Sequence, residues 1–405
     1  MNLLIGQKLY ESFVEVSDSM CQYFSTWTYN EPIIITKETY YKMQRVQKLL
    51  YKSIRYFVEH YDDFRILMPV SERIYEILSL YKDKPYRVGT YRTDFLFDKN
   101  NNIKLIEITC RFALNGFFTT GYFNRMADKY LENQINVQTI DAYKRFYDYL
   151  MRYFGEFDHV CILKGSDDRN ETKHIIDIFE KAGYRVHVIH TDSISEKLYL
   201  LDNAAVIGEL DHEEICSLPT DTIRSIIHSN LINDLRTVFL IHDKRFFSVL
   251  YNNDFLNAAL SEDERNEFMN YLLPTYTWGE KSEIVAHVKN NKNKWIIKPS
   301  VFGKSIDVYA GCATSEDEWQ VLFTEERIKK MVFQSYVEQR KFAGAIKGKH
   351  YEDYAAGTLL FFDDNFFGPG LFRASSFPVT NKVDDRKIFS IVTDDITDSN
   401  SFIIV

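Results

Sequence analysis

The chain has 405 residues, of which 45% are hydrophobic and 26% charged, with only 8 Pro and 16 Gly. This composition is that of a globular protein and excludes the disordered, collagen-like and membrane-spanning classes. The formal charge of -9 argues against a large nucleic-acid surface, which needs a basic face. We therefore expect neither a nucleic acid nor a membrane as a partner.

The length exceeds that of one ordinary hydrophobic core, so we expect subdomains that share a cleft. Five scattered cysteines without CxxC spacing argue against a disulfide framework or a zinc site, and favour buried thiols in a reducing cytosol. The start of the chain has no basic segment, and no stretch approaches the roughly 18 apolar residues of a membrane span. We predict a cytoplasmic protein.

Residues 1–85 are predicted to form a helical N-terminal region, because apolar residues recur at three-to-four spacing in Tyr41–Phe57 and in Arg73–Tyr81. No motif of chemical interest occurs there.

Residues 86–155 open with two β-runs, Val88–Phe97 and Ile103–Ile108, joined by the polar turn 98–102. A hairpin is the simplest structure for this pattern. Helical patterns follow through Thr119–Tyr153.

A strand-helix-strand pattern opens residues 156–242, with β-runs at His159–Leu163 and Tyr184–Ile189. Two further apolar runs, Asn203–Ile207 and Thr237–Ile241, complete a predicted small parallel sheet. The loop after the first run lacks the GxGxxG dinucleotide fingerprint, so we expect a structural or substrate-lining role for this subdomain.

Residues 243–405 alternate short helices with β-runs at Trp295–Pro299, Asp307–Ala310, Met331–Glu338, Ala355–Phe362 and Phe366–Ala374. The expected fold class is therefore α/β, more strictly α+β, in four segments: 1–85, 86–155, 156–242 and 243–405.

Asp94 and Glu107 lie on the two predicted hairpin strands, close enough for both carboxylates to reach one hard cation. Magnesium suits this arrangement, since it prefers one or two carboxylates together with substrate phosphates and water. A surface hairpin with solvated acids is the alternative, but Glu107 lies in an apolar run, where an unpaired charge would be costly. Arg92, on the same strand face as Asp94, suits a carboxylate or a transferring phosphoryl group, or else forms a structural ion pair.

Lys298 ends one β-run, and the loop that follows, Ser300-Val-Phe-Gly303-Lys-Ser305, is small and polar enough to close over phosphates. Such a loop donates backbone N–H groups while the lysine supplies charge, although it is not the GxxxxGK[ST] P-loop. Further on, Gln334-Ser-Tyr336-Val337 ends an apolar run and offers main-chain groups to an adenine ring. A plain core strand is the alternative for that run.

Arg373 follows Gly368 and Gly370, which permit the close approach of a ligand or loop. It is our candidate for gripping a substrate carboxylate, with a surface or ion-paired arginine as the alternative. Ten histidines lack metal-binding spacing, and no Ser-His-Asp or nucleophile-elbow pattern occurs, which argues against a hydrolase.

Taken in order, these motifs resemble the ATP-grasp ligases, and within them the branch of glutathionylspermidine synthase and eukaryotic-type glutathione synthetase. Four blocks match: Arg92-Thr-Asp94 with Ile106-Glu107-Ile-Thr109, His242-Asp-Lys244 through Leu250 with Leu272-Leu-Pro274-Thr275, Lys298-Pro299 with its loop, and Gly357 through Gly368-Pro-Gly-Leu-Phe-Arg373 to Thr380. The metal acids precede the ATP lysines, which is the order of this circularly permuted branch and differs from most ATP-grasp enzymes.

The resemblance implies an ATP-grasp core formed by residues 86–155 and 243–405, the latter with a lid, beside a helical N-terminal region and a small parallel-sheet (pre-ATP-grasp-like) subdomain. It implies that ATP is held by Lys244, Lys298, Ser300, Gly303, Ser305, Gln334, Tyr336 and Val337, and Mg2+ by Asp94, Glu107 and Thr109. Arg92 and Arg373 would be catalytic, the first stabilising the transferring phosphoryl group and the second facing the acceptor substrate.

Two positions depart from the family pattern. Thr109 stands where relatives have a metal-binding Asn, and the loop Phe302-Gly-Lys-Ser305 lacks their acidic residue. The predicted function is an ADP-forming ligase that joins a small-molecule or peptide carboxylate to an amine through an acyl phosphate. The alternatives are a catalytically inactive nucleotide-binding protein and an ATP-grasp phosphotransferase.

Overall fold

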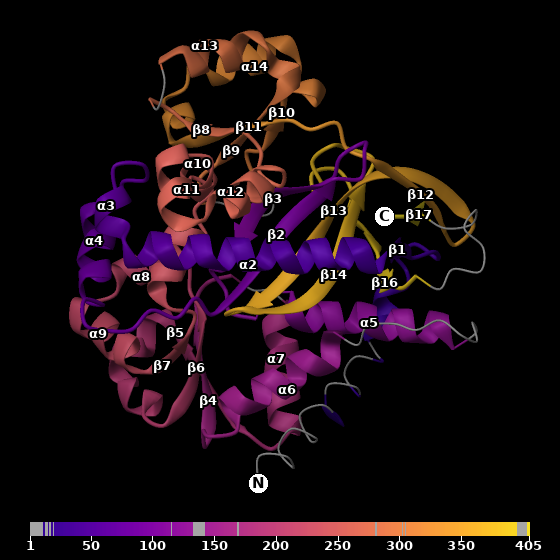
Figure 1. Cartoon of the computed structure of the whole chain (residues 1–405). Helices are drawn as coiled ribbons and strands as arrows, with labels where there is room; N and C mark the ends of the chain where they lie inside the picture. The colour runs from indigo at the N-terminus through magenta and orange to yellow at the C-terminus, as the bar shows by residue number, and fades with distance from the viewer. Residues whose placement is uncertain are drawn as a thin grey trace.

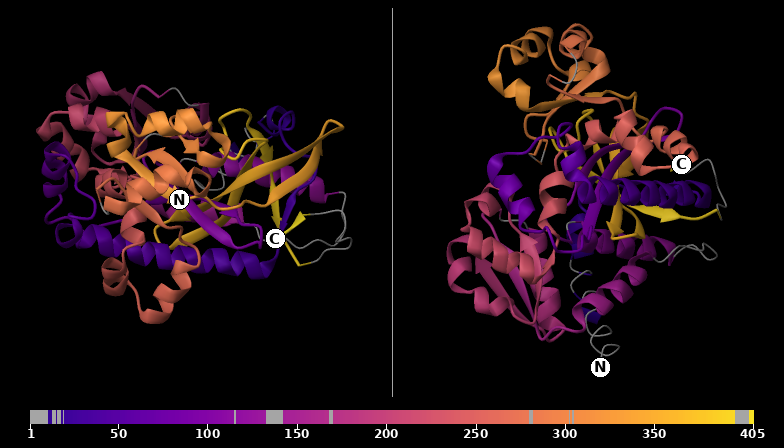
Figure 2. Two further views of the ribbon diagram at one scale, coloured as in Figure 1. Left: turned by 90° about the horizontal axis from the view of Figure 1, so that it is seen from above. Right: turned by 60° about the vertical axis from the view of Figure 1, so that its left-hand side comes forward.

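The computed structural model describes residues 11, 12, 15, 18, 20–114, 116–132, 142–167, 170–279, 282–301, 303, 305–394 and 403–405. It is a mixed α/β fold with helices and several sheets, which confirms the predicted α+β class at that level. Figure 1 shows a parallel sheet at lower left, a larger antiparallel sheet in the centre and a small upper lobe, and Figure 2 shows the same parts from two further sides.

The central sheet joins the first half of the chain to its last part. Its strand order is β15-β14-β13-β2-β3, with β12 paired to β13. The strands are β2 (Thr90–Phe97), β3 (Ile103–Thr109), β12 (Lys341–Ile346), β13 (Lys349–Phe362), β14 (Asn365–Ser375) and β15 (Arg386–Ile388), and every pairing is antiparallel. Because β13 lies between β2 and β14, Asp94 and Arg373 are separated by a single strand.

The predicted hairpin is confirmed as β2 and β3, and the Asp98 side chain closes its turn. The Asp98 carboxylate accepts hydrogen bonds from the main-chain N–H groups of Asn100 and Asn102 at 2.8 and 2.9 Å. Asn101 adopts the left-handed conformation with a φ of 63°. Asn and Asp tolerate this conformation and bond to their own backbone, so the Asn-rich segment turns the chain.

Alternation along β2 separates a core face from a cavity face. Tyr91, Phe95 and Phe97 are buried in the same core as the apolar side of α2 (Lys37–Glu59), the long helix that crosses the sheet in Figure 1. Successive side chains on a strand point to opposite faces, so Arg92 and Asp94 are directed away from that core. The same alternation that fills the core therefore places two charged groups on the other face.

The predicted helical pattern in Thr119–Tyr153 corresponds to α5 (Phe117–Leu131) and α6 (Ala142–Phe154); its middle part, 133–141, lies outside the described residues. Both helices pack on the face of the central sheet that is opposite α2. Leu360 and Phe362 of β13 pack there with Phe117 and Phe146, whereas Phe361 between them packs on the α2 side.

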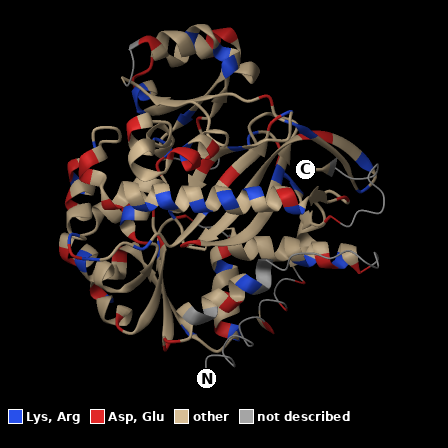
Figure 3. Cartoon of the chain, in the orientation of Figure 1, with Lys and Arg blue, Asp and Glu red and all other residues tan. Residues whose placement is uncertain are grey.

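Basic residues recur along α2, where the ribbon is repeatedly blue in Figure 3, and several of them are paired with acidic groups. Arg45 contacts Glu267 at 2.8 Å and Glu264 at 3.8 Å, and Lys52 also contacts Glu264. Both acids belong to α12 (Glu262–Met269). These pairs hold α2 against the segment that precedes the upper lobe.

The predicted parallel sheet is present, but one of its strands was assigned wrongly. The sheet contains β4 (His159–Lys164), β5 (Arg185–His190), β6 (Ala204–Glu209) and β7 (Asn230–Ile232) in the order β5-β4-β6-β7, with α7 (Asn170–Lys181) between β4 and β5. Thr237–Ile241, expected as a strand, forms a π-helical turn. All five of its residues are buried, and a short run that is apolar on every side cannot be assigned from periodicity.

The upper lobe is a second antiparallel sheet with helices on its outer side. Its order is β10-β9-β11-β8, formed by β8 (Thr275–Thr277), β9 (Trp295–Pro299), β10 (Tyr309–Ala310) and β11 (Met331–Ser335), with α13 (Ser282–Asn290) and α14 (Glu316–Leu322). The predicted runs Asp307–Ala310 and Met331–Glu338 are longer than the strands. Asp307 takes a left-handed φ of 53°, and the Tyr336 N–H turns to the Lys294 carbonyl at 2.8 Å.

A fourth sheet, three-stranded and parallel, corrects the prediction that residues 1–85 are all helical. Its order is β16-β1-β17, formed by β1 (Ile33–Ile35), β16 (Ser390–Val392) and β17 (Ile403–Ile404). Further α-helices among the described residues are α3 (Tyr61–Phe64), α4 (Glu72–Ser79), α8 (His212–Ser217), α9 (Thr220–His228), α10 (Phe246–Leu250) and α11 (Asn253–Ala259). Among the described residues, no helix combines the length and the apolar character that crossing a bilayer requires.

The aromatic core beneath the cavity strand gives a stability prediction. Phe95 is fully buried and meets Phe97 and Phe372 edge to face, and a Cβ on Gly357 would lie only 2.6 Å from its ring. We predict that Phe95→Ala lowers the free energy of unfolding by about 3–5 kcal/mol. The exposed Tyr41→Ala on α2 should change it by no more than about 0.5 kcal/mol. Equal urea midpoints for the two variants would contradict this packing.

Candidate functional site

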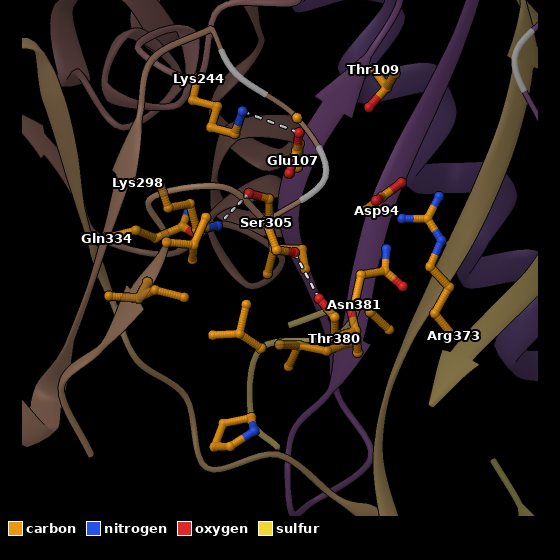
Figure 4. A pocket seen from close by; sticks show the side chains of 18 of the residues that line it. Asp94, Glu107, Thr109, Lys244, Lys298, Ser305, Gln334, Arg373, Thr380 and Asn381 are labelled. Atoms are coloured by element: carbon orange, nitrogen blue, oxygen red, sulfur yellow. Dashed lines mark hydrogen bonds and ion pairs between the residues drawn. The ribbon is translucent and has the colours of Figure 1, made fainter. Parts of the chain in front are cut away.

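A cavity of about 300 Å3 lies between the cavity face of the central sheet and the upper lobe. The predicted residues that line it are Arg92, Asp94, Glu107, Thr109, Lys244, Lys298, Gly303, Ser305, Gln334, Tyr336, Val337 and Arg373. Ser300 is not among the lining residues, and its carbonyl accepts a hydrogen bond from the Lys244 N–H at 2.8 Å. Figure 4 shows side chains from both halves of the chain converging on this space.

Strand register places the two carboxylates opposite each other. Asp94 pairs with Glu107, and Arg92 pairs with Thr109. A β-bulge follows, because Phe95 pairs with Leu105 and leaves Ile106 unmatched. Bulges re-aim side chains next to functional sites. Here the bulge allows both Ile106 and Glu107 to line the cavity, while Leu105 and Ile108 stay in the core.

Arg92 and Asp94 form an ion pair on the same strand. The Arg92 Nε donates to Asp94 Oδ1 at 2.9 Å, and the side chains are only 9% and 12% exposed. The Arg92 Nη2 also reaches the Thr109 hydroxyl at 3.5 Å. Gly116, with a φ of +87°, lets the chain pass close to the Arg92 side chain, which a Cβ there would approach to 3.2 Å.

Lys244 and Glu107 link the second half of the chain to the hairpin. The Lys244 Nζ lies 3.2 Å from Glu107 Oε1, and Figure 4 shows this pair. The lysine side chain is 3% exposed, whereas that of Glu107 is 24% exposed. Burial opposes ionisation of Glu107, but the charges of Lys244, Lys298 and Arg92 hold its pKa below the ordinary value.

Lys298, which comes from β9 of the upper lobe, is held by two acceptors. Its Nζ donates to the Ile106 carbonyl at 3.0 Å and to Gln334 Oε1 at 2.8 Å. The Gln334 amide in turn donates to the Thr275 hydroxyl at 3.1 Å, so all three groups are fixed. Burial lowers the pKa of Lys298 to about 8, and the nearby Glu107 carboxylate limits that decrease.

Arg373 reaches the cavity from β14. In the amide orientation that satisfies both neighbours, Asn381 accepts from Arg373 at 3.2 Å and donates to Asp385 at 2.6 Å. Burial and the charge of Arg92 lower the pKa of Arg373 below its ordinary value. Figure 4 shows its guanidinium pointing toward Asp94, so the two arginines and the Asp94 carboxylate lie together.

The loop after β9 crosses the cavity to a segment near the C-terminus. The Ser305 hydroxyl donates to the Thr380 carbonyl at 2.7 Å, and Ser305 has a φ of 56°. Phe302 and Lys304, which belong to the predicted loop, lie outside the described residues. Beyond β11, Tyr336 and Val337 line the cavity at the end where the strand pairing stops.

The lining residues to which the sequence pattern assigned no individual role include Arg111, Phe112, Asp167 and His242. Arg111 lies over the Phe112 ring at 4.1 Å, directly after β3, and Asp167 follows β4. Their positions just beyond strand ends are a signal that could have suggested a site. His242 precedes Lys244 by two residues and belongs to a matched block.

The residues present fit a magnesium ion that is held together with phosphates. Within the described part of the chain, no group of three or more His, Cys, Asp and Glu side chains could hold a metal by itself. Asp94 and Glu107, in register across two strands, supply two carboxylates, and Thr109 adds a hydroxyl. Magnesium commonly takes one or two carboxylates and completes its shell with substrate phosphates and water.

Comparison with known proteins supports the fold. A glutathione synthetase-like effector from Globodera pallida, in its apo form, matches with a TM-score of 0.57 over 96% of this chain and 97% of that chain, at 14% identity. A family described as the AnkG N-terminal domain matches residues 46–240, which include the hairpin but neither Lys244 nor Lys298. No curated protein sequence matches. The chain therefore has a glutathione synthetase-like fold.

The charges around Lys298 lead to a pH prediction. Its folded pKa, about 8, lies below the ordinary 10.5, so the unfolded chain binds more protons between these values. The Lys298 contribution to the free energy of unfolding therefore rises with pH across this window. Because Glu107 limits the decrease, Glu107→Gln should lower the pKa of Lys298 further.

Both effects can be read from NMR titration of lysine Cε resonances, with Lys298→Met identifying the signal. Lys99, exposed and paired with Glu338, serves as the reference, since that contact raises its pKa. Titration of Lys298 near 10.5, or an unchanged pKa in Glu107→Gln, would contradict the described charge arrangement.

Proposed function

We propose that the chain is an ATP-dependent carboxylate-amine ligase of the ATP-grasp type, which forms an amide through an acyl phosphate and releases ADP and phosphate. The observation that carries this proposal is the meeting of Lys244 and Lys298 with the Asp94–Glu107 pair in one cavity. Ammonium groups beside paired carboxylates are the partners that a magnesium-nucleotide complex needs. The glutathione synthetase-like fold is consistent with this class of reaction.

ATP would lie between the upper lobe and β3, with its phosphates beside Lys244 and Lys298. The loop that carries Gly303 and Ser305 would cover the phosphates, and its bond to Thr380 anchors it across the cavity. Adenine would lie at Gln334–Val337. Tyr336 and Val337 lie past the end of β11, and the Tyr336 N–H donates to the Lys294 carbonyl at 2.8 Å, so the main-chain groups offered to adenine would be the Tyr336 carbonyl and the Val337 N–H.

Bound Mg2+, held by Asp94, Glu107 and the Thr109 hydroxyl, would neutralise phosphate charge and polarise the transferring group. The two ion pairs described above could exchange partners when the nucleotide binds. Lys244 can leave Glu107 for a phosphate oxygen, and Arg92 can leave Asp94 for the transferring phosphoryl group. The Glu107 and Asp94 carboxylates would then be paired with Mg2+ instead of Lys244 and Arg92, so no charge in the cavity would be left uncompensated.

Arg92 and Arg373 would act on the reacting groups. The Arg92 guanidinium stabilises negative charge that spreads over the phosphoryl oxygens. Arg373, held by Asn381, binds the substrate carboxylate by two parallel hydrogen bonds and orients it for attack on phosphorus. Covering of the phosphates by the loop after β9 would shield the acyl phosphate from water until the amine attacks.

We predict that Lys298→Ala and Arg92→Ala each reduce acid-dependent ADP release by about a hundredfold or more, because each removes a cation aimed at phosphate. Lys99→Ala, at an exposed position on the hairpin turn, is the matched control and should retain full activity. ADP release should be measured with ATP, Mg2+ and panels of carboxylic acids and amines. Unchanged release by either cavity variant would remove that residue from the mechanism.

Hydroxylamine trapping distinguishes the ligase from the two alternatives. An acyl phosphate reacts with hydroxylamine to give a hydroxamate, so the ligase should yield hydroxamate in proportion to ADP. ADP release without hydroxamate would indicate a phosphotransferase. ATP binding without any acid-dependent turnover would indicate an inactive nucleotide-binding protein, a reading that Thr109 favours because its single hydroxyl is a weaker metal ligand than an Asn carbonyl.

A further inference from the structure

Asp243, the residue before Lys244, is a buried carboxylate that does not line the cavity. Its Oδ1 accepts from the Arg245 N–H at 2.8 Å, and its Oδ2 accepts from Arg245 Nε and Nη2 at 2.9 and 2.7 Å. The Arg245 Nη1 also donates to the Pro69 carbonyl at 2.8 Å. An aspartate that bonds to the backbone two residues on closes a turn. This turn has Lys244 at its centre and is fastened to the N-terminal helical region.

The main chain of Lys244 is held on both sides of its side chain. Its N–H donates to the Ser300 carbonyl at 2.8 Å, and its carbonyl accepts from the Phe247 N–H at 3.1 Å. The turn comes directly after the π-helical turn Thr237–Ile241, and π-helical turns occur frequently at functional sites. The direction in which the Lys244 side chain leaves the backbone is therefore set by Asp243 and by the loop after β9.

The proposed exchange of ion-pair partners makes this backbone support necessary. The Lys244 Nζ lies 3.2 Å from Glu107 Oε1, and this contact holds the end of the side chain. In the proposed function the ammonium group leaves Glu107 for a phosphate oxygen, so the contact no longer positions it. Ordering a long, flexible side chain costs conformational entropy, and that cost is smaller when the backbone beneath it is already fixed. The turn at Asp243 supplies such a backbone.

We propose that Asp243 is a positioning residue, which holds the Lys244 backbone through Arg245 so that the ammonium group reaches the nucleotide phosphates. This inference rests on the ligase function proposed above. Ser300 belongs to the loop that would cover the phosphates, so its bond to the Lys244 N–H keeps that loop and the lysine in one arrangement. Asp243 acts through Lys244 and makes no contact with a substrate.

A second turn of the same design, just before the π-helical turn, provides a matched control. Asp234 accepts from the Arg236 N–H at 2.9 Å and from Arg236 Nη2 at 2.7 Å, and Arg236 Nη1 donates to the Lys84 carbonyl at 3.1 Å. The Asp234 and Arg236 side chains are 8% and 13% exposed. The central residue of this turn is Leu235. Loss of either aspartate should lower stability, since each leaves a buried arginine without its partner, but only Asp243 adjoins the lysine.

Binding of MgATP to the full-length protein, measured by calorimetry on variants shown to be folded by circular dichroism, tests the proposal without requiring turnover. Asp243→Ala should weaken binding by about tenfold or more, because Lys244 must then be ordered by the nucleotide itself. Asp234→Ala should leave binding within about twofold, since the two turns share no partner. Asp243→Asn keeps an oxygen that can accept from the Arg245 N–H and should recover part of the loss. Equal weakening by both Ala variants, or an Asn variant no better than Ala, would overturn the proposal.

A double-mutant cycle with Lys244→Ala separates positioning from a general effect on the fold. If Asp243 acts through Lys244, Asp243→Ala should change MgATP binding by no more than about twofold once the lysine is absent. The same loss with and without the lysine would contradict this. If Asp243→Ala does not fold, Arg245→Lys takes its place in the cycle, because it removes the paired hydrogen bonds to Asp243 and keeps the charge.

Failure of this proposal is distinguishable from failure of the ligase function. Weakened MgATP binding in Lys244→Ala together with unchanged binding in Asp243→Ala would overturn the role of Asp243 alone. A wild-type protein that does not bind MgATP would contradict both proposals. The expected cycle in a protein that never releases ADP in the presence of an acid would support the positioning of Lys244 and contradict the ligase reaction.

Discussion

Charge compensation between Lys244 and Glu107 is the interaction on which the site depends. Glu107 lies on a strand whose neighbours Leu105 and Ile108 belong to the core, and the Lys244 side chain is almost completely buried. A charge in such a place is stable only with a partner, and removing one partner leaves the other uncompensated. The pair, at 3.2 Å, therefore ties the segment before α10 to the early hairpin and brings two distant parts of the chain to one cavity.

The sheet supplies the second constraint. Register sets Asp94 opposite Glu107, and the bulge beyond them lets Ile106 face the cavity with its carbonyl accepting from Lys298. The aromatic core on the other face, with Phe95 at its centre, holds β2 in this register, because a slip of one residue would exchange the two faces. The same strand therefore contributes to stability and to the site, because packing on its core face fixes the positions of the side chains on its cavity face.

The local features of the site could be predicted from the sequence, whereas their long-range partners could not. Alternating apolar and polar residues on either side of an Asn-rich turn identify the hairpin, and the apolar run Trp295–Pro299 matches β9. The π-helical turn Thr237–Ile241 and the short strand Ile33–Ile35 escape this reasoning, since a short run of apolar residues carries no period. Arg111 and Asp167 lie just beyond strand ends and His242 lies in a matched block, but their meeting around one cavity depends on three distant segments and is not encoded by any local pattern. The roles assigned to the predicted residues remain predictions, although the fold brings nearly all of them together.

The most direct measurement is a crystal structure of the full chain with a non-hydrolysable ATP analogue and Mg2+. We predict phosphates between Lys244 and Lys298, a metal ion between those phosphates and the carboxylates of Asp94 and Glu107, and adenine at Gln334–Val337. A nucleotide bound elsewhere on the chain, or a cavity in which Lys244 stays on Glu107 while the phosphates lie outside, would contradict this prediction.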